Sequence, residues 1–185
     1  MNRQDWIRAA LDALAERGVA GVAVDRLAKT LGATRGSFYW HFSHRTELIE
    51  AALEQWEHEN TTALIPAADA IGDPVARLRF LFQLVYEQPV DAVELALASA
   101  ADEPLVEPVF VRVTRARLAF LRRIFSDLGL PNDEADDRAW FAYAFYIGHH
   151  QLGRSPEIQA LQPARLDRLV ELLTSRAGAP PTPPA

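Results

Sequence analysis

The stretch from residue 24 to residue 48 constrains the fold more tightly than any other part of the chain. Leu27 and Leu31 recur at helical spacing, so a short helix there has one apolar face. Gly32 follows at once, and glycine tolerates the left-handed backbone conformation with which a sharply ended helix closes. Thr34 can then accept a hydrogen bond from an unpaired N–H group at the start of a second short helix. The stretch therefore predicts a helix-turn-helix, a motif whose second helix lies in the major groove of DNA.

Polar and basic side chains lie on and beside the second helix, on a face where the fold does not need them. Arg35, at the entry of that helix, is the candidate for reading a base, because arginine bonded to guanine is the commonest specific contact. Gly36 lets the backbone approach DNA closely, and Ser37 can bond to a phosphate or to a base edge. Arg45 and Lys29 are expected to contact phosphates. The predicted DNA contacts are Lys29, Thr34, Arg35, Gly36, Ser37, Tyr39, His41 and Arg45.

The aromatic residues of this stretch divide between core and surface. Phe38 and Phe42 are four positions apart, on the face that packs on the first helix, and are predicted core residues. Trp40 is compatible with either packing or contact. Asp25 lies in the first turn of the first helix, where a carboxylate suits the helix dipole but repels phosphate.

The segment Gly36-Ser37-Phe38-Tyr39-x-His41-Phe42, with Leu31-Gly32-Ala33-Thr34 before it and Arg45-x-x-Leu48 after it, resembles the DNA-binding domain of the tetracycline-repressor-like (TetR) family of bacterial regulators. The resemblance covers roughly the first quarter of the chain. It implies a homodimer that binds a palindromic operator in double-stranded DNA and, as a repressor, is released by a small molecule. One position departs from the family, because residues 21–24 offer no hydroxyl where Ser or Thr usually caps the first helix of the pair.

The net charge of −6 is distributed unevenly along the chain. Residues 1–50 hold seven basic and six acidic side chains, and the remaining residues hold 12 basic and 19 acidic ones. The predicted DNA-binding end is therefore only weakly basic. Its nonspecific affinity for DNA is expected to be modest, since that affinity scales with the number of phosphates neutralised.

The rest of the chain reads as helices, with no repeat and no convincing strand. Ser43 is the expected N-cap of a long helix running toward Pro66, and Asp73-Pro74 opens another. A longer helix is expected to open at Glu103-Pro104, and the last one at Pro163. The predicted fold is all-α, with about nine helices. The expected domains are a three-helix helix-turn-helix domain over 1–48, a ligand-binding and dimerisation bundle over 49–177, and a disordered proline-rich tail over 178–185.

Bulky side chains with polar tips occur on three helices of the predicted bundle. Such a set can hold an apolar or aromatic small molecule and orient one polar end of it. The same spacing is also that of an ordinary aromatic core, and both interpretations stay open here. The candidate effector residues are Phe82, Tyr86, Phe120, Trp140, Tyr143, Tyr146 and His149.

Residues 139–147 are apolar nearly all the way round the helix that they predict. Such a helix has to bury two faces, which favours a homodimer in which the last two helices pack across a two-fold axis. The alternative is a central helix in a monomeric bundle. The candidate dimer residues are Phe141, Phe145, Leu152, Leu166, Leu169 and Leu173.

Several classes of function find no support in the sequence. There is no cysteine, which excludes disulfides and thiolate metal sites. His149 and His150 are adjacent, so they point about 100° apart on a helix and do not chelate a metal jointly. No nucleotide-binding or hydrolase motif occurs, so we expect no cofactor and no catalysis.

Neither a signal peptide nor an apolar run of about 20 residues is found, so no membrane association and a cytoplasmic location are expected. The alternatives to a ligand-responsive regulator are an architectural DNA-binding protein without an effector and, less favoured, a helical-bundle enzyme.

Overall fold

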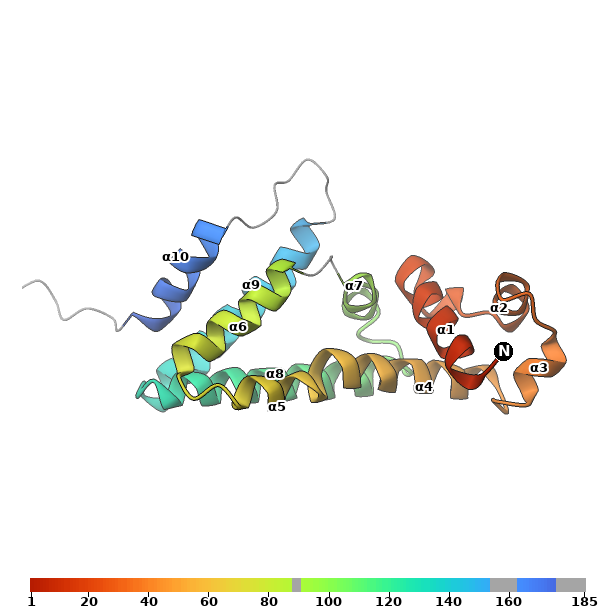
Figure 1. Ribbon diagram of the computed structural model, residues 1–185, viewed down its shortest axis with the longest axis horizontal. Coiled ribbons are helices and arrows are strands. Elements are labelled where there is room, and N and C mark those ends of the chain that lie inside the picture. The colour runs from red at the N-terminus through yellow and green to blue at the C-terminus, as the bar shows by residue number, and fades with distance from the viewer. Residues whose placement is uncertain (88–90, 154–162, 176–185) are drawn as a thin grey trace, which may run out of the picture. The chain divides into compact units, whose positions relative to one another are not determined.

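The chain is helical throughout the part that the structure describes (Figure 1). The structure is a computed structural model; it describes residues 1–87, 91–153 and 163–175, with backbone alone at 85–87 and 163–164. No β-strand occurs among those residues, and the all-α prediction is confirmed. The predicted tail, 178–185, lies outside them. The helices are α1 (Arg3–Arg17), α2 (Val24–Thr30), α3 (Arg35–Tyr39), α4 (Arg45–Glu57), α5 (Leu64–Asp69), α6 (Pro74–Glu87), α7 (Ala92–Ser99), α8 (Glu107–Asp127), α9 (Asn132–Leu152) and α10 (Pro163–Thr174), with a short 3₁₀-helix η1 (Val19–Gly21) and a π-helix η2 (His58–Thr62).

The start of α4 differs from the prediction by one residue. The N-cap is His44, not Ser43, and the His44 Nδ1 atom accepts a hydrogen bond from the Glu47 N–H group at 3.1 Å. The Glu47 carboxylate in turn accepts from the Ser43 N–H group at 2.7 Å. That backbone bond is the main reason why the pKa of Glu47 lies below its usual value. The His44 ring thus takes the capping place that serine or threonine usually fills, and Glu47 bonds to the residue before the cap, so the two bonds do not form the reciprocal pair of a capping box.

Two predicted helices begin or end elsewhere. The helix expected to run from Ser43 toward Pro66 is interrupted, because α4 ends at Glu57 and the chain continues through the π-helix η2 into α5. In η2 the Ala63 N–H group donates to the His58 carbonyl five residues back, at 2.9 Å. The helix expected from Glu103 begins instead at Glu107. That start places Pro108 in the first turn, where its missing N–H group removes no helical hydrogen bond.

The described residues form two compact units, which are treated separately below. Unit 1 comprises residues 1–64 and 91–116, and the described residues of unit 2 are 65–87, 117–153 and 163–175. The predicted boundary after Leu48 falls inside α4, whereas unit 1 extends to Leu64 and includes α7 and the first half of α8. The division of labour between a DNA-binding and a ligand-binding domain therefore stays a prediction.

The core of unit 1 is built on α1, which packs against α2, α4 and α7. Trp6 and Leu14 of α1 are fully buried, as the apolar stripe of that helix requires. They meet Phe38 of α3 and Leu48 and Leu53 of α4, which are also fully buried. Because Phe38 contributes to this core, the short helix α3 is fixed in place by tertiary packing rather than by its own length.

The core of unit 2 is formed by α6, the second half of α8, α9 and α10. Its largest buried side chains include Leu78, Phe82, Phe120 and Phe125. The most buried charge of the unit lies beside this core. Arg77, in α6, has a side chain that is only 10% exposed.

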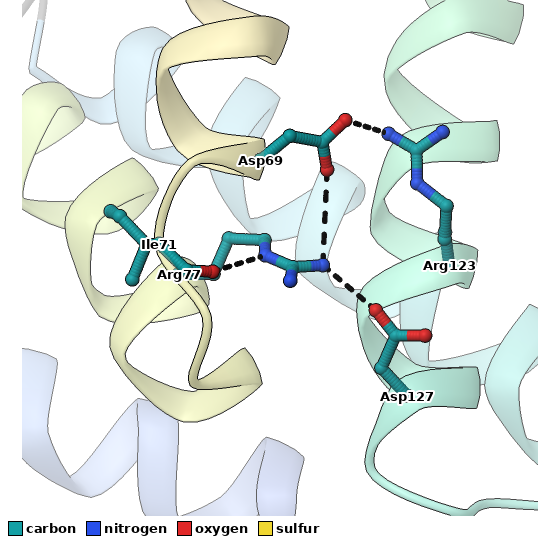
Figure 2. Close-up of polar contacts among 5 residues, drawn as sticks. All are labelled: Asp69, Ile71, Arg77, Arg123 and Asp127. Atoms are coloured by element: carbon teal, nitrogen blue, oxygen red, sulfur yellow. Dashed lines mark hydrogen bonds and ion pairs between the residues drawn. The ribbon is translucent and has the colours of Figure 1, made fainter.

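Arg77 joins the ends of three helices (Figure 2). Its guanidinium donates to the carboxylate of Asp127 at 2.8 Å and to the Ile71 carbonyl at 3.1 Å. The carboxylate of Asp69 lies 3.8 Å from the same terminal nitrogen and accepts a bond from Arg123 at 2.6 Å. Asp69 and Asp127 are the last residues of α5 and α8, where the helix dipole disfavours a carboxylate. Pairing with the arginines offsets that local cost.

Candidate nucleic-acid interface

The turn between α2 and α3 has the predicted geometry. Gly32 adopts a φ of 63°, in the left-handed region that favours glycine. The Ala33 N–H group reaches back to the Ala28 carbonyl at 2.8 Å and so closes α2. Thr34 is the N-cap of α3, and its hydroxyl accepts from the Ser37 N–H group at 3.2 Å. The Ser37 hydroxyl donates to the Thr34 carbonyl at 2.7 Å, so Ser37 also stabilises the first turn of α3.

The predicted split of α3 into a buried and an outward face is confirmed. Phe38 and Phe42 are buried, and the Phe38 ring lies edge-on to Trp6 at a centroid distance of 5.4 Å. Tyr39 and Trp40 are exposed, and Trp40 most of all, at 87%. An indole this exposed takes almost no part in the core of unit 1. The spacing already contained this signal, because Trp40 lies between the two core positions 38 and 42.

Gly36 has no packing reason to be glycine. A Cβ atom built there would meet only the Thr34 hydroxyl, at an ordinary contact distance of 3.7 Å. Its φ is not in the left-handed region. The fold of the chain therefore gives no reason for glycine at this position.

Arg35 forms an ion pair on the outward face. Its Nε atom lies 3.0 Å from a carboxylate oxygen of Asp25, in the first turn of α2. A hydrogen bond to Tyr39, followed by the charge of Asp25, raises the pKa of Arg35 above its usual value. The sequence pattern indicated Asp25 only as a charge that repels phosphate. The pair depends on the α2–α3 turn, because only that turn brings positions ten residues apart into contact.

The remaining predicted DNA contacts differ in exposure and in the groups that they contact. Lys29 is exposed in the last turn of α2. The Nε2 atom of His41 lies 3.3 Å from the Met1 carbonyl oxygen. Arg45 is half-buried and donates to the carbonyls of Val22, at 2.5 Å, and Val19. Arg45 therefore holds the η1 segment against α4, whether or not its remaining donors reach a phosphate.

Unit 2 brings some of the predicted effector residues together. The rings of Tyr143 and Tyr146 stack at 5.9 Å, and Tyr146 meets the ring of His150 edge-on at 4.6 Å. His149 stacks on Phe145 at 6.3 Å, and Phe145 meets Phe82 edge-on at 5.9 Å. Burial lowers the pKa of His149 below its usual value.

Other predicted effector residues do not join this set. Trp140 is 61% exposed on another face of α9. Phe120 is buried, with Arg123 over its ring at 5.0 Å. The side chain of Tyr86 lies outside the described part of the chain.

Arg117 joins this set although the sequence pattern did not single it out. Its guanidinium lies over the Tyr146 ring at 5.2 Å and donates to the Tyr146 hydroxyl at 3.4 Å. The signal was available, because Arg117 continues the apolar stripe of Val113, Phe120 and Ile124 on α8 at helical spacing. A charged residue on such a stripe points to a specific polar contact.

Several of the predicted dimer residues are covered within unit 2, and the dimer interface stays a prediction. Leu166 and Leu173 are buried in the core of unit 2, and Leu169 packs on that core, so the inward face of α10 is already covered. Phe145 belongs to the internal cluster with Phe82 and His149. By contrast, Phe141 and Leu152 are exposed, at 66% and 56%.

Together with Trp140 and Ala144, the exposed pair Phe141 and Leu152 forms an apolar stripe along one face of α9. This set of four residues is called the α9 stripe below. The opposite face of the helix carries Ala135, Ala139 and Ala142, which are buried. The expectation that this helix presents two apolar faces is therefore confirmed.

Membrane spans and metal clusters are both absent from the part of the chain that the structure describes. No helix there is long and apolar enough to cross a membrane. No group of histidine and acidic side chains in the described ranges could hold a metal ion.

A short helix whose outward residues are basic, hydroxylic and aromatic, joined to another by a glycine turn, defines a helix-turn-helix protein. Residues 7–52 match the model of the tetR family of bacterial regulatory proteins. Over these residues the chain is similar to the TetR family of transcriptional regulators.

Individual relatives are similar mainly over the N-terminal part. The tetracycline repressor protein class A from transposon 1721 of Escherichia coli is 44% identical over 63 residues, which cover 34% of this chain and 29% of that protein. The HTH-type transcriptional regulator TtgR of Pseudomonas putida is 33% identical over 90 residues, 48% of this chain and 42% of TtgR. The matched region thus spans less than half of either relative.

Solved structures extend the similarity of fold over most of the chain. AibR, solved in complex with isovaleryl coenzyme A and operator DNA, superimposes with a TM-score of 0.68. The alignment covers 93% of this chain and 97% of AibR, at 19% sequence identity. At that identity the likeness shows the fold alone.

Proposed function

We propose that this protein is a ligand-responsive repressor that binds a palindromic operator as a homodimer and leaves it when a small molecule binds unit 2. The observation that carries the DNA-binding part is the outward face of α2 and α3. Arg35, Gly36, Tyr39 and Trp40 are exposed there, while Phe38 anchors the helix from the other side. A regulator of this kind acts in the cytoplasm, where the bacterial chromosome lies.

The α9 stripe supports the homodimer. Its members are apolar side chains on one helix face, and in a monomer they stay in contact with water. We infer that a second copy of the chain covers the stripe, because the resulting dimer then has two helix-turn-helix motifs. A palindromic operator needs two heads, placed roughly 34–36 Å apart, to read successive major grooves.

The aromatic set of unit 2 supports the effector part. Tyr143, Tyr146 and His149 combine apolar rings with polar tips. Such a lining suits a small, mainly apolar or aromatic molecule with one polar end. AibR, whose structure holds both isovaleryl coenzyme A and operator DNA, has the same fold.

The experiment that tests the DNA-binding part works without a known operator sequence. The full chain is mixed with a pool of random duplexes, and the bound fraction is recovered and sequenced through several rounds. We expect an inverted repeat with two half-sites. Recovery of a single, unrepeated half-site would contradict the dimer, and the absence of any enriched sequence would contradict the regulator.

The effector part is tested with the operator recovered in this way. Small aromatic and aliphatic acids, amines and thioesters are added one at a time to the protein–operator complex. A coupling of 1–3 kcal/mol corresponds to operator binding about 5–150-fold weaker. Tyr146→Ala should blunt the response to any active compound and leave operator affinity nearly intact. A compound that releases wild-type and variant equally acts at another site.

A further inference from the structure

Asp25 is an unexpected residue for a surface that approaches DNA. Its side chain is 71% exposed in the first turn of α2. The N-cap of that helix, Ala23, makes no side-chain hydrogen bond, so α2 begins without a hydroxyl cap. A carboxylate here repels the phosphate backbone, and each lost or opposed charge lowers affinity for DNA of any sequence. Stabilising the helix dipole alone does not require Asp25, because an uncharged cap would serve.

The contact between Asp25 and Arg35 explains its presence. Asp25 Oδ1 lies 3.0 Å from Nε of Arg35, the guanidinium nitrogen nearest the backbone. Arg35 is the first residue of α3, so its side chain leaves the helix beside the α2–α3 turn. A guanidinium carries five N–H donors in a rigid, planar fork, and fixing one edge of the fork therefore sets the direction of the rest.

Tyr39 also influences Arg35. It lies one turn further along α3 than Arg35 and is exposed. Its hydrogen bond with Arg35 and the charge of Asp25 both act in the sense of raising the pKa of Arg35. The contact that restrains this long, flexible side chain is therefore the carboxylate of Asp25, from the other helix of the motif.

We propose that Asp25 is a positioning residue that orients Arg35 toward guanine, so that the surface loses affinity for DNA in general and gains discrimination between bases. The proposal rests on the proposed function, in which Arg35 reads a base. In the free protein an exposed ion pair is weak. At a protein–DNA interface water is displaced, and the same pair is stronger because the local dielectric constant is lower.

Two opposite changes follow from replacing Asp25 by Asn in the full chain. The variant D25N removes one negative charge, so binding to random duplex at low salt should become about 2–5-fold tighter. Discrimination at the one base pair per half-site that Arg35 reads should fall by about 5-fold or more, because a directed arginine–guanine contact is lost. The matched control is D12N, which removes one exposed carboxylate of α1 in the same unit. It should leave discrimination unchanged.

The test measures base preference by sequencing the bound fraction of a random duplex pool for wild type, D25N, D12N, R35A and the double variant D25N/R35A. In the R35A background, D25N should change base preference no further, since the two residues act as a unit. If D25N lowers preference equally with and without Arg35, Asp25 contacts a base itself and the positioning role is wrong. Tighter binding with full discrimination would reduce Asp25 to a repelling charge and also overturn the proposal.

A measurement without DNA separates this proposal from the proposed function. The NMR signal of the Arg35 Nε–H group is recorded in protein labelled with ¹⁵N-arginine and is assigned through R35A. In D25N this signal should shift, and its proton should exchange faster with water. In D12N neither change should occur. An unchanged Arg35 signal overturns the pairing even if the protein binds an operator. If wild type enriches no sequence although the signal does shift, the proposed function fails while the pairing stands. Asp25 is exposed, so both variants should unfold at the wild-type temperature; if D25N does not fold, D25S serves in its place.

Discussion

Two arginines near the helix-turn-helix differ in what surrounds them, and this decides what each contributes. Arg35 is exposed and paired with an exposed carboxylate, whereas Arg45 is half-buried and donates to two backbone carbonyls. Removing Arg35 leaves no buried polar group behind. Removing Arg45 leaves the Val19 and Val22 carbonyls without these donors, which costs about 1–3 kcal/mol where such groups are buried. Loss of DNA binding in an Arg45 variant is therefore not evidence of a phosphate contact until its stability is known.

The first prediction concerns base reading by Arg35. Arg35→Ala should weaken operator binding by about 1–3 kcal/mol and relax the preference at one position per half-site. Lys29→Ala is the matched control, because an exposed lysine that contacts phosphate should weaken all sequences alike and lower the salt slope by about one unit. Titration of the operator and of single-base variants at several salt concentrations measures both. Equal losses on all sequences for Arg35→Ala would assign Arg35 to phosphate.

The second prediction concerns stability and pH at His149. Burial lowers the pKa of His149, so the unfolded chain binds a proton at this residue more readily than the folded chain does. The folded protein should therefore lose stability as the pH falls below about 6.5, the usual pKa of histidine, and His149 should contribute no pH dependence above it. Denaturant unfolding between about pH 5 and pH 8, on either side of that value, measures this. His149→Gln should flatten the acid side of the curve, and an unchanged curve would contradict the assignment.

At the scale of single elements, the ends of α5, α6 and α8 are held by charges that local rules do not favour. Carboxylates terminate α5 and α8, and Arg77 lies near the start of α6, each at the unfavourable end of its own helix dipole. Only their meeting in the folded unit makes the arrangement favourable. Arg77 also donates to the Ile71 carbonyl in the turn between α5 and α6, so the same side chain fixes the turn.

The third prediction tests this arrangement. Arg77→Met should lower the free energy of unfolding by about 1–3 kcal/mol, because the Ile71 carbonyl loses its donor and the two carboxylates lose a buried partner. Arg123→Met removes a guanidinium that bonds to the same Asp69 but is half exposed, and should cost at most about 1 kcal/mol. Denaturant titration of both variants decides between them. If both variants lose the same free energy of unfolding, the burial of Arg77 adds nothing to stability.

At the scale of the whole molecule, we expect the α9 stripe to determine the assembly. Its members are exposed, whereas Leu166 and Leu173 of α10 are inside unit 2. Charge introduced on the stripe should therefore act between copies, and charge introduced at Leu173 should act within one copy.

The fourth prediction uses this contrast. Phe141→Glu should give a folded monomer, because a carboxylate cannot be buried in an apolar interface without a partner. Leu173→Glu should unfold unit 2 instead, and Ala67→Glu, at an exposed position of α5, should change neither property. Sedimentation and circular dichroism of the full chain distinguish these results. A wild-type monomer at micromolar concentration, or a dimeric Phe141→Glu, would contradict the interface.

Short-range sequence patterns were sufficient to predict the helix-turn-helix. The positive φ of Gly32, the cap at Thr34 and the burial of Phe38 and Phe42 all follow from residues within one or two turns of one another. Periodicity also predicted that α9 has two apolar faces. The N-cap of α4 at His44 was missed, because the histidine ring takes a capping role that usually belongs to a hydroxyl.

The sequence by itself determined the all-α class, the turn between α2 and α3 and the outward position of Arg35, because hydrogen-bond caps, glycine conformations and helical spacing act over a few residues. Only the tertiary structure decided which face of α9 lies in the core, that Leu166 and Leu173 are internal, and that Arg77 meets Asp127 from a helix 50 residues away. It also paired Arg35 with Asp25. Such contacts depend on how elements pack, and packing is a property of the assembled unit that no local pattern contains.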